Sequence, residues 1–142
     1  MSVRVIQIPG GGTGFTDCPE VAFVCSTNED AALVVRYVAG PVARKRQPMG
    51  VLTFRPVWMF RWISSSIEHF PEDDPDDTQF GLVEILRSPL VERAAQGTVW
   101  ADQISERFGP GIPENRVRHF RLSFDEIGHF DVLADEVIVA AE

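Results

Sequence analysis

Three histidines, His69, His119 and His129, are the side chains most suited to making an active site. A catalytic histidine needs a nucleophile on one side and an orienting acid on the other. The alternating pattern of the C-terminal region predicts that His129 lies beside Asp125 and His119 opposite Asp135. Such pairs can orient an imidazole, but they are equally typical of a solvated strand face. Because no Ser or Cys lies at a recognisable nucleophile turn, we predict no catalytic residue.

A glycine-rich segment, Gly10 to Gly14, follows the first predicted strand. Glycines let backbone N–H groups approach an anion closely, but the segment lacks the Lys-Ser/Thr of a P-loop and the spacing of the dinucleotide fingerprint. It also resembles the glycine loop of the tubulin-like GTPases, although the chain is too short for that fold. A flexible turn is the favoured interpretation. The alternative is an anion site in which Gly11 and Gly12 act together with His119 and Arg121.

Acidic residues are concentrated in one segment that contains no basic residue. They are Glu68, Glu72, Asp73, Asp74, Asp76 and Asp77. The segment lacks the ligand spacing of a calcium-binding loop, so we predict no metal site there. A solvated loop is the favoured interpretation. The alternative is a docking surface in which Asp73, Asp74, Asp76 and Asp77 contact a basic protein partner.

Three arginines, Arg55, Arg61 and Arg121, are predicted to lie on one sheet face. Together they could bind an anionic group. The favoured interpretation is that they extend over a half-exposed face and pair with acids such as Glu84.

Cys18 and Cys25 are the only cysteines. They lack the Cys-x-x-Cys spacing of a zinc or redox site, and two cysteines make no disulfide framework. No apolar run is long enough for a signal-peptide core or a membrane span. We therefore expect a cytoplasmic location, free thiols and no cofactor.

The size and charge of the chain restrict its class. Its 142 residues, 44% of them hydrophobic, fit a single domain spanning residues 1–142. The net charge is −8, from 13 basic and 21 acidic residues. Nucleic acids and anionic membranes both require an extended basic surface, so neither is an expected partner. The oligomeric state stays open.

The elements that would position these residues are strands followed by helices. Strands are predicted at Val3 to Ile8, Leu33 to Val38, Val51 to Ile63, Phe80 to Leu86 and Val137 to Ala140. Within the third strand, an aromatic set shares one parity, which predicts an aromatic strand face. Its members are Phe54, Trp58, Phe60 and Trp62. Pro56 places this strand at a sheet edge or at a bulge.

Two helices are expected to cover that aromatic face. Ser88-Pro89 is typical of a helix start, because Ser caps free N–H groups and Pro suits the first helical position. This helix would end near Gln96. A second helix would begin at Thr98 and extend to about Phe108, with its apolar residues four apart on one face.

The C-terminal region predicts a β-hairpin. Burying both apolar sets on one face requires the pairs Phe124 with Phe130, Leu122 with Val132 and Phe120 with Ala134. The loop would then be Glu126-Ile127-Gly128, with glycine in the left-handed position.

Two segments, residues 80–91 around Ser88-Pro89 and residues 118–125, resemble small uncharacterised bacterial proteins. An ending like residues 130–134 accompanies them. Some of these proteins look like immunity or accessory proteins of bacterial competition systems. The resemblance covers about a third of the chain, implies a small non-catalytic bacterial domain, and assigns no functional residue.

These observations predict an α+β domain with an antiparallel or mixed sheet of about five to seven strands and two short helices on one face. The expected function is non-enzymatic protein binding by a bacterial domain of the immunity-like or accessory kind. The alternative is a small enzyme or ligand-binding protein for an anionic small molecule.

Overall fold

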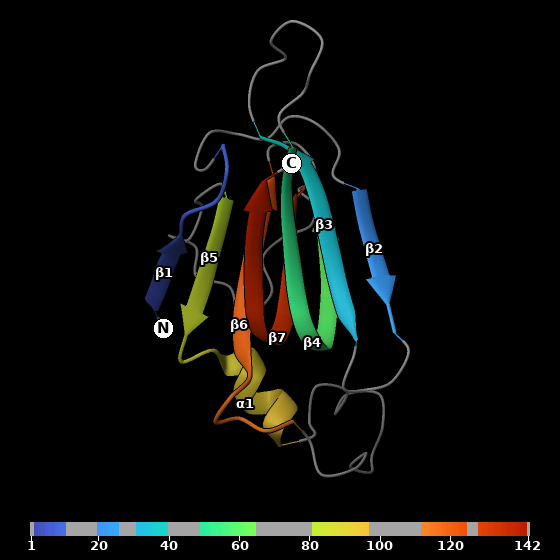
Figure 1. Ribbon diagram of the computed structural model, residues 1–142. Coiled ribbons are helices and arrows are strands. Elements are labelled where there is room, and N and C mark those ends of the chain that lie inside the picture. The colour runs from blue at the N-terminus through green and yellow to red at the C-terminus, as the bar shows by residue number, and fades with distance from the viewer. Residues whose placement is uncertain are drawn as a thin grey trace, which may run out of the picture.

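The computed structural model describes residues 2–10, 20–25, 31–39, 49–64, 81–96, 112–124 and 128–141. They form one antiparallel seven-stranded sheet in the order β1-β5-β6-β7-β4-β3-β2, with a single helix (Figure 1). The strands are β1 Ser2–Ile6, β2 Glu20–Val24, β3 Ala32–Val38, β4 Met49–Ser64, β5 Gly81–Leu86, β6 Arg118–Phe124 and β7 Gly128–Ala141, and the helix is α1 Pro89–Ala95. The predicted strands near β1, β3, β4 and β5 are confirmed to within a few residues, whereas β2 was not predicted.

The prediction of an α+β domain with two helices over one sheet face is wrong. The described part of the chain is almost entirely sheet, and α1 is its only helix. The second predicted helix, residues 98–108, lies outside the described residues. The bent sheet itself buries Phe54 of the aromatic face, whereas Trp58, Phe60 and Trp62 stay exposed.

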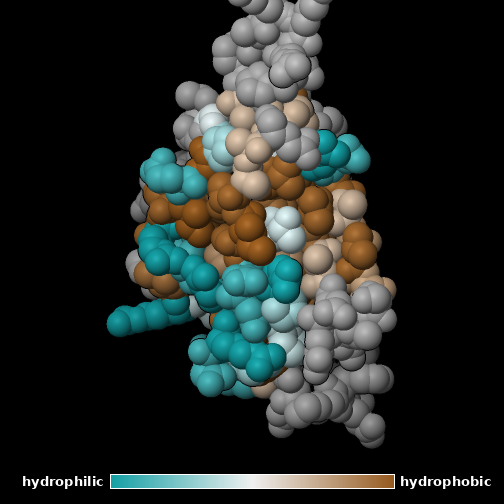
Figure 2. All heavy atoms as spheres, viewed as in Figure 1, coloured by the Kyte–Doolittle hydropathy of each residue, from teal (hydrophilic) through white to brown (hydrophobic). Residues whose placement is uncertain are grey.

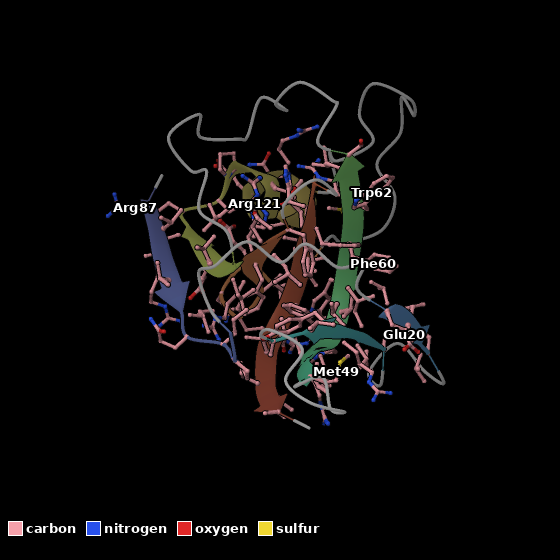
Figure 3. The ribbon with its side chains drawn as sticks, turned by 90° about the horizontal axis from the view of Figure 1, so that it is seen from above. Glu20, Met49, Phe60, Trp62, Arg87 and Arg121 are labelled. Carbon is pink, nitrogen blue, oxygen red and sulfur yellow. The ribbon has the colours of Figure 1, made fainter. Side chains whose placement is uncertain are left out.

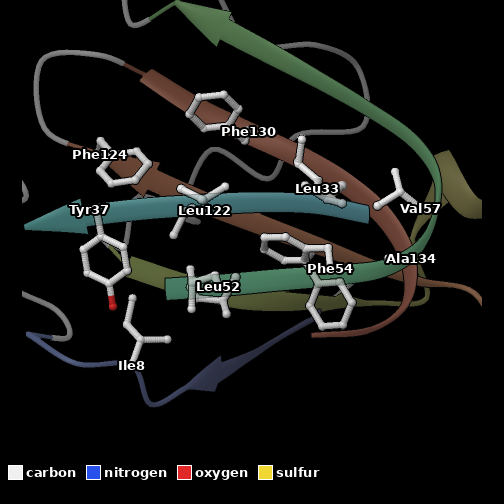
Figure 4. Packing of buried hydrophobic residues seen from close by; sticks show 14 residues of the cluster. Ile8, Leu33, Tyr37, Leu52, Phe54, Val57, Leu122, Phe124, Phe130 and Ala134 are labelled. Atoms are coloured by element: carbon white, nitrogen blue, oxygen red, sulfur yellow. The ribbon is translucent and has the colours of Figure 1, made fainter. Parts of the chain in front are cut away.

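The bend lies in the two longest strands, β4 and β7, which pair along nearly their whole length (Figure 4). The register shifts between Val57 and Met59, so β4 has a bulge near the predicted Pro56 irregularity. Leu52 and Phe54 face the core before the bend, and Val57 faces it afterwards, so the inward parity changes. The two halves of each strand therefore belong to opposite layers of the fold.

The core lies between these layers. Fourteen buried residues form it, and Phe54 and Phe120 from different strands place their ring centroids 5.6 Å apart. Ile8, from the segment after β1, also packs in this core (Figure 4). The hydroxyl of Tyr37 donates to the carbonyl of Pro9 at 2.7 Å, which ties that segment to β3 at the far side of the sheet order.

Helix α1 packs on the other face of the sheet. Its start is confirmed: Ser88 is the N-cap, its Oγ accepts from the Val91 N–H at 3.2 Å, and Pro89 follows. Leu90, Val91 and Ala94 pack with Val117 and Leu133 in a second apolar cluster. No helix in the described ranges is long and apolar enough to cross a membrane. The cytoplasmic location stays a prediction.

The C-terminal hairpin is confirmed, but its predicted register is wrong by two residues. Phe124 lies opposite Gly128, Leu122 opposite Phe130, and Phe120 opposite Val132. An even shift leaves every side chain on its predicted face. The predicted partners Phe124 and Phe130 still touch diagonally, with ring centroids 6.0 Å apart. Gly128 has the positive φ expected of it, 111°, but it is the first residue of β7.

Candidate functional site

The predicted site residues fall into two groups. Gly11, Gly12 and the acidic residues Asp73, Asp74, Asp76 and Asp77 lie outside the described residues. His119 and Arg121 lie on β6, and the structure brings both of them to Asp131 of β7. The corrected register accounts for this, because it sets Arg121 directly opposite Asp131.

The carboxylate of Asp131 lies at the centre of a polar cluster. Arg121 Nε donates to its Oδ1 at 2.9 Å, and Arg61 Nε donates to its Oδ2 at 3.0 Å. His119 Nε2 lies 2.7 Å from Oδ1. These residues come from three neighbouring strands, because Asp131 of β7 lies between Arg121 of β6 and Arg61 of β4.

Burial decides how this cluster should be interpreted. Asp131 is 0% exposed, His119 1% and Arg121 3%, so the prediction of a solvated hairpin face is wrong. The predicted acid for His119 is also wrong. Asp135 instead accepts from Trp58 Nε1 at 2.8 Å and pairs with Arg116 at 3.0 Å.

Electrostatics favour the ionised form of Asp131. Burial by itself would raise the pKa of this carboxyl, but the hydrogen bonds and charges of His119 and Arg121 hold it well below its usual range. A buried carboxylate of this kind is an acceptor that fixes its donors in place. The cluster therefore orients His119 and Arg121, and no observation favours their release to bind an anion.

The three arginines predicted to share a face separate into two groups. Arg61 and Arg121 both pair with Asp131, while Arg55 lies near Glu136 at 3.5 Å on the surface. Glu84 pairs instead with Arg4 at 2.5 Å and with Arg118 at 2.7 Å. A hydrogen bond from Arg118 is the main cause that lowers the pKa of Glu84.

A second candidate site is an exposed apolar surface at the β2 edge of the sheet. All five residues of β2 are exposed, including Phe23 at 50%. Phe60 and Trp62 of β4 are 40% and 54% exposed, and Phe23 and Phe60 place their ring centroids 5.4 Å apart. Figure 3 shows Arg121 on one side of β4 and these two β4 aromatics on the other. We call Val21, Phe23, Phe60 and Trp62 the aromatic seam.

The seam corrects the prediction that the aromatic face of β4 is buried. Phe54 is fully buried, but Trp58, Phe60 and Trp62 follow the bend, where β3 no longer pairs with β4. Apolar side chains also gather on the outer face of the middle strands (Figure 2). There Ile138 lies opposite Thr53, which in turn lies opposite Val34.

Sequence reasoning missed Asp131 and β2 for different reasons. The spacing His119-x-Arg121 beside His129-x-Asp131 put two basic side chains and an acid on one face, but the misplaced register separated them. Residues 21–24, with the sequence Val-Ala-Phe-Val, carried the signature of a short strand. No group of three or more His, Cys, Asp or Glu side chains in the described ranges is arranged to hold a metal ion.

Comparison with known proteins gives no relative. The chain matches no protein-family model, no curated protein and no solved structure.

Proposed function

We propose that this domain binds a partner protein by accepting an extended segment of that partner along β2. The observation that carries the proposal is that β2 is the last strand of the sheet and exposes all five of its residues. An edge strand presents backbone N–H and C=O groups that can pair with another chain. Proteins usually protect such edges with charge or proline; β2 has one charge, Glu20 at its first position, and residues 21–24 have neither.

The side chains of β2 define what the segment must look like. Val21 and Phe23 lie opposite the core residues Val35 and Leu33, so they lie on the core side of the sheet, where Phe23 meets Phe60 in the aromatic seam. Ala22 lies opposite Val34 and so continues the apolar outer face. A strand added beside β2 would extend both faces, and its side chains would alternate between them. The matching segment is therefore short and apolar on both faces.

The charge of the chain selects a basic partner. The net charge is −8, and the acidic segment that begins at Glu68 follows β4 and its exposed Trp62 in the sequence. Such a concentration of charge accelerates encounter with a basic protein and suppresses acidic competitors. Asp73, Asp74, Asp76 and Asp77 have this steering role in the proposal. An immunity or accessory role in a bacterium, implied by the resemblance described above, belongs to the same proposal.

The test uses a labelled synthetic peptide with a short run of valine and phenylalanine between lysine pairs. We expect anisotropy to detect binding that weakens as salt is added. Phe23→Ser should weaken binding by at least about tenfold, which corresponds to about 1.4 kcal/mol. Val5→Ser is the matched control, because Val5 is 52% exposed on β1 at the other end of the sheet.

Two results would contradict the proposal. One is equal binding by the Phe23→Ser and Val5→Ser proteins. The other is equal affinity for a peptide of the same apolar sequence with glutamate in place of lysine. Replacing Asp73, Asp74, Asp76 and Asp77 with Asn separates steering from contact. It should slow association and reduce the salt dependence, and an unchanged association rate would remove the acidic segment from the proposal.

A further inference from the structure

A sharp turn between β5 and α1 holds Ser88. The strand ends at Leu86, the helix begins at Pro89, and only Arg87 and Ser88 connect them. Arg87 has φ 56°, in the left-handed region that a non-glycine residue seldom adopts. Strained backbone of this kind concentrates at functional sites, and a sharp strand-to-helix turn is where serine hydrolases hold their nucleophile. Ser88 itself is extended, with φ −65° and ψ 123°, so the unusual conformation belongs to its neighbour Arg87.

Ser88 lies at one end of a continuous hydrogen-bonded chain. Its Oγ lies 2.7 Å from His119 Nδ1, and His119 Nε2 lies 2.7 Å from Asp131 Oδ1. The ionised carboxylate can only accept, so Nε2 carries a proton; in the neutral imidazole Nδ1 then accepts from the serine hydroxyl. Oγ in turn accepts from the Val91 N–H at 3.2 Å. Nucleophile, base and orienting acid are thus connected in that order.

Three adjacent strands supply this arrangement. Ser88 follows β5, His119 lies on β6 and Asp131 on β7, and these strands are neighbours in the sheet. The two imidazole nitrogens exchange the roles that they hold in the best-known serine proteases, where Nε2 is the base and Nδ1 contacts the aspartate. The roles follow from geometry, and either nitrogen can accept a proton.

A cavity of about 340 Å³ opens onto the serine and the imidazole. Both Ser88 and His119 line it, together with the apolar side chains of Val91 and Val117. Arg118 also lines it, but Glu84 holds that guanidinium through two hydrogen bonds of 2.7 and 2.9 Å. The volume suits a small ligand. Arg87 lines the cavity as well, but so do Glu92 and Glu114, so the lining does not select an anionic acyl group.

We propose that Ser88 is the catalytic nucleophile of an esterase site for short-chain, uncharged carboxylic esters. This activity is independent of the binding surface on β2. Ser88 Oγ bonds to the ester carbonyl carbon, and its proton moves to His119 Nδ1. The bond to the alcohol oxygen breaks, and the leaving alcohol takes that proton. Water then attacks the acyl carbon, gives a proton to Nδ1, and releases the acid as Ser88 regains a proton.

The test uses the whole chain and a tagged alkyl fluorophosphonate. Ser88 Oγ should displace fluoride from phosphorus, and one tag per chain should map to the peptide containing Ser88. Ser88→Gly should reduce labelling and the hydrolysis of p-nitrophenyl acetate by roughly 100-fold or more. Glycine is tolerated at a helix N-cap, so this variant tests the hydroxyl with α1 preserved. Ser123→Ala, on β6 but outside the chain of hydrogen bonds described above, should label like the parent protein.

Asp131 is a positioning residue, since it acts through His119. The dependence of the labelling rate on pH is the readout that separates this role from a structural one. Asp131→Asn should change that pH profile, which a purely structural role would not do. Failure of the folded parent protein to label, labelling at another residue, or unchanged hydrolysis in Ser88→Gly would each overturn the proposal. Circular dichroism establishes that each variant is folded.

Discussion

His119 Nε2 lies 2.7 Å from Asp131 Oδ1, with both side chains almost fully removed from solvent. The two residues are not directly opposite each other, since His119 is paired with Leu133 across the two strands. The contact is therefore diagonal, and it leaves the direct position opposite Asp131 to Arg121. The carboxylate of Asp131 thus contacts both His119 and Arg121, which occupy two successive outward positions of β6.

The first prediction concerns removal of that carboxylate. Asp131→Ala leaves the buried guanidinium of Arg121 without its counter-ion, and breaking a buried pair from one side typically costs about 3–5 kcal/mol. We expect the free energy of unfolding to fall by about this amount, measured by urea denaturation followed by tryptophan fluorescence. Much of the stability of a domain this size would be lost.

The control for Asp131→Ala is a surface ion pair whose acid, Glu136, lies on the same strand, β7, while its arginine, Arg55, lies on β4. Arg55 and Glu136 are 3.5 Å apart, with side chains 59% and 54% exposed. Exposed pairs contribute at most about 1 kcal/mol, so Glu136→Ala should change the free energy of unfolding by less than that. Equal losses in the two variants would contradict the role given to burial.

The second prediction is a loss of stability in acid that depends on Asp131. The folded protein holds the pKa of this carboxyl well below its usual range, whereas in the unfolded chain it returns to about 3.9. Its contribution is therefore fully present above that unfolded pKa and is lost as the pH falls toward the folded pKa. The difference in unfolding free energy between the parent protein and Asp131→Asn should be large near neutral pH and should shrink below about pH 4. A difference that does not vary with pH would contradict the prediction.

The third prediction concerns Tyr37 in alkali. Burial raises the pKa of Tyr37 from 10.0 to about 12. Because the unfolded chain loses this proton first, the stability from keeping Tyr37 neutral is complete below pH 10 and is lost between pH 10 and about pH 12.

The chain has a single tyrosine, so the ultraviolet absorbance of tyrosinate reports this group directly. The absorbance change should come at a higher pH in the native protein than in urea. Coincident titrations in the two states would contradict the burial of the hydroxyl beside the Pro9 carbonyl.

The local features of this fold follow from its sequence. Alternation predicts the faces of β6 and β7, and Ser88-Pro89 predicts the start of α1, because each depends on neighbours in the chain. The register between two strands cannot be predicted in this way, since an offset of two residues buries the same side chains and leaves their parity unchanged. The pairing of Arg121 with Asp131 depends on that offset, so the polar cluster could not be assembled from periodicity alone.

The bend in β4 likewise made the burial of its aromatic face unpredictable from the sequence. Period-two patterning treats Phe54 and Trp62 as equivalent, yet they are 0% and 54% exposed. The difference arises because β3 pairs with β4 only as far as Phe54, and the strand then turns into the other layer. Whether a strand crosses from one layer of the fold to the other at a bulge depends on its tertiary contacts. A proline in the sequence indicates only the position of the bulge. Trp58, Phe60 and Trp62 were therefore predicted as core.

The fourth prediction concerns Gly50, which lies opposite Tyr37 in the ladder. A Cβ at this position would overlap the Tyr37 ring, which is fully buried and held by its bond to Pro9. Gly50→Ala should reduce the free energy of unfolding by about 1–3 kcal/mol, as overpacking does in dense cores. In a Tyr37→Leu background the same substitution should have a much smaller effect, because the obstructing ring is absent. A double-mutant cycle by urea denaturation measures this coupling, and additive effects would show that Gly50 is required for its backbone conformation instead of for space beneath the ring.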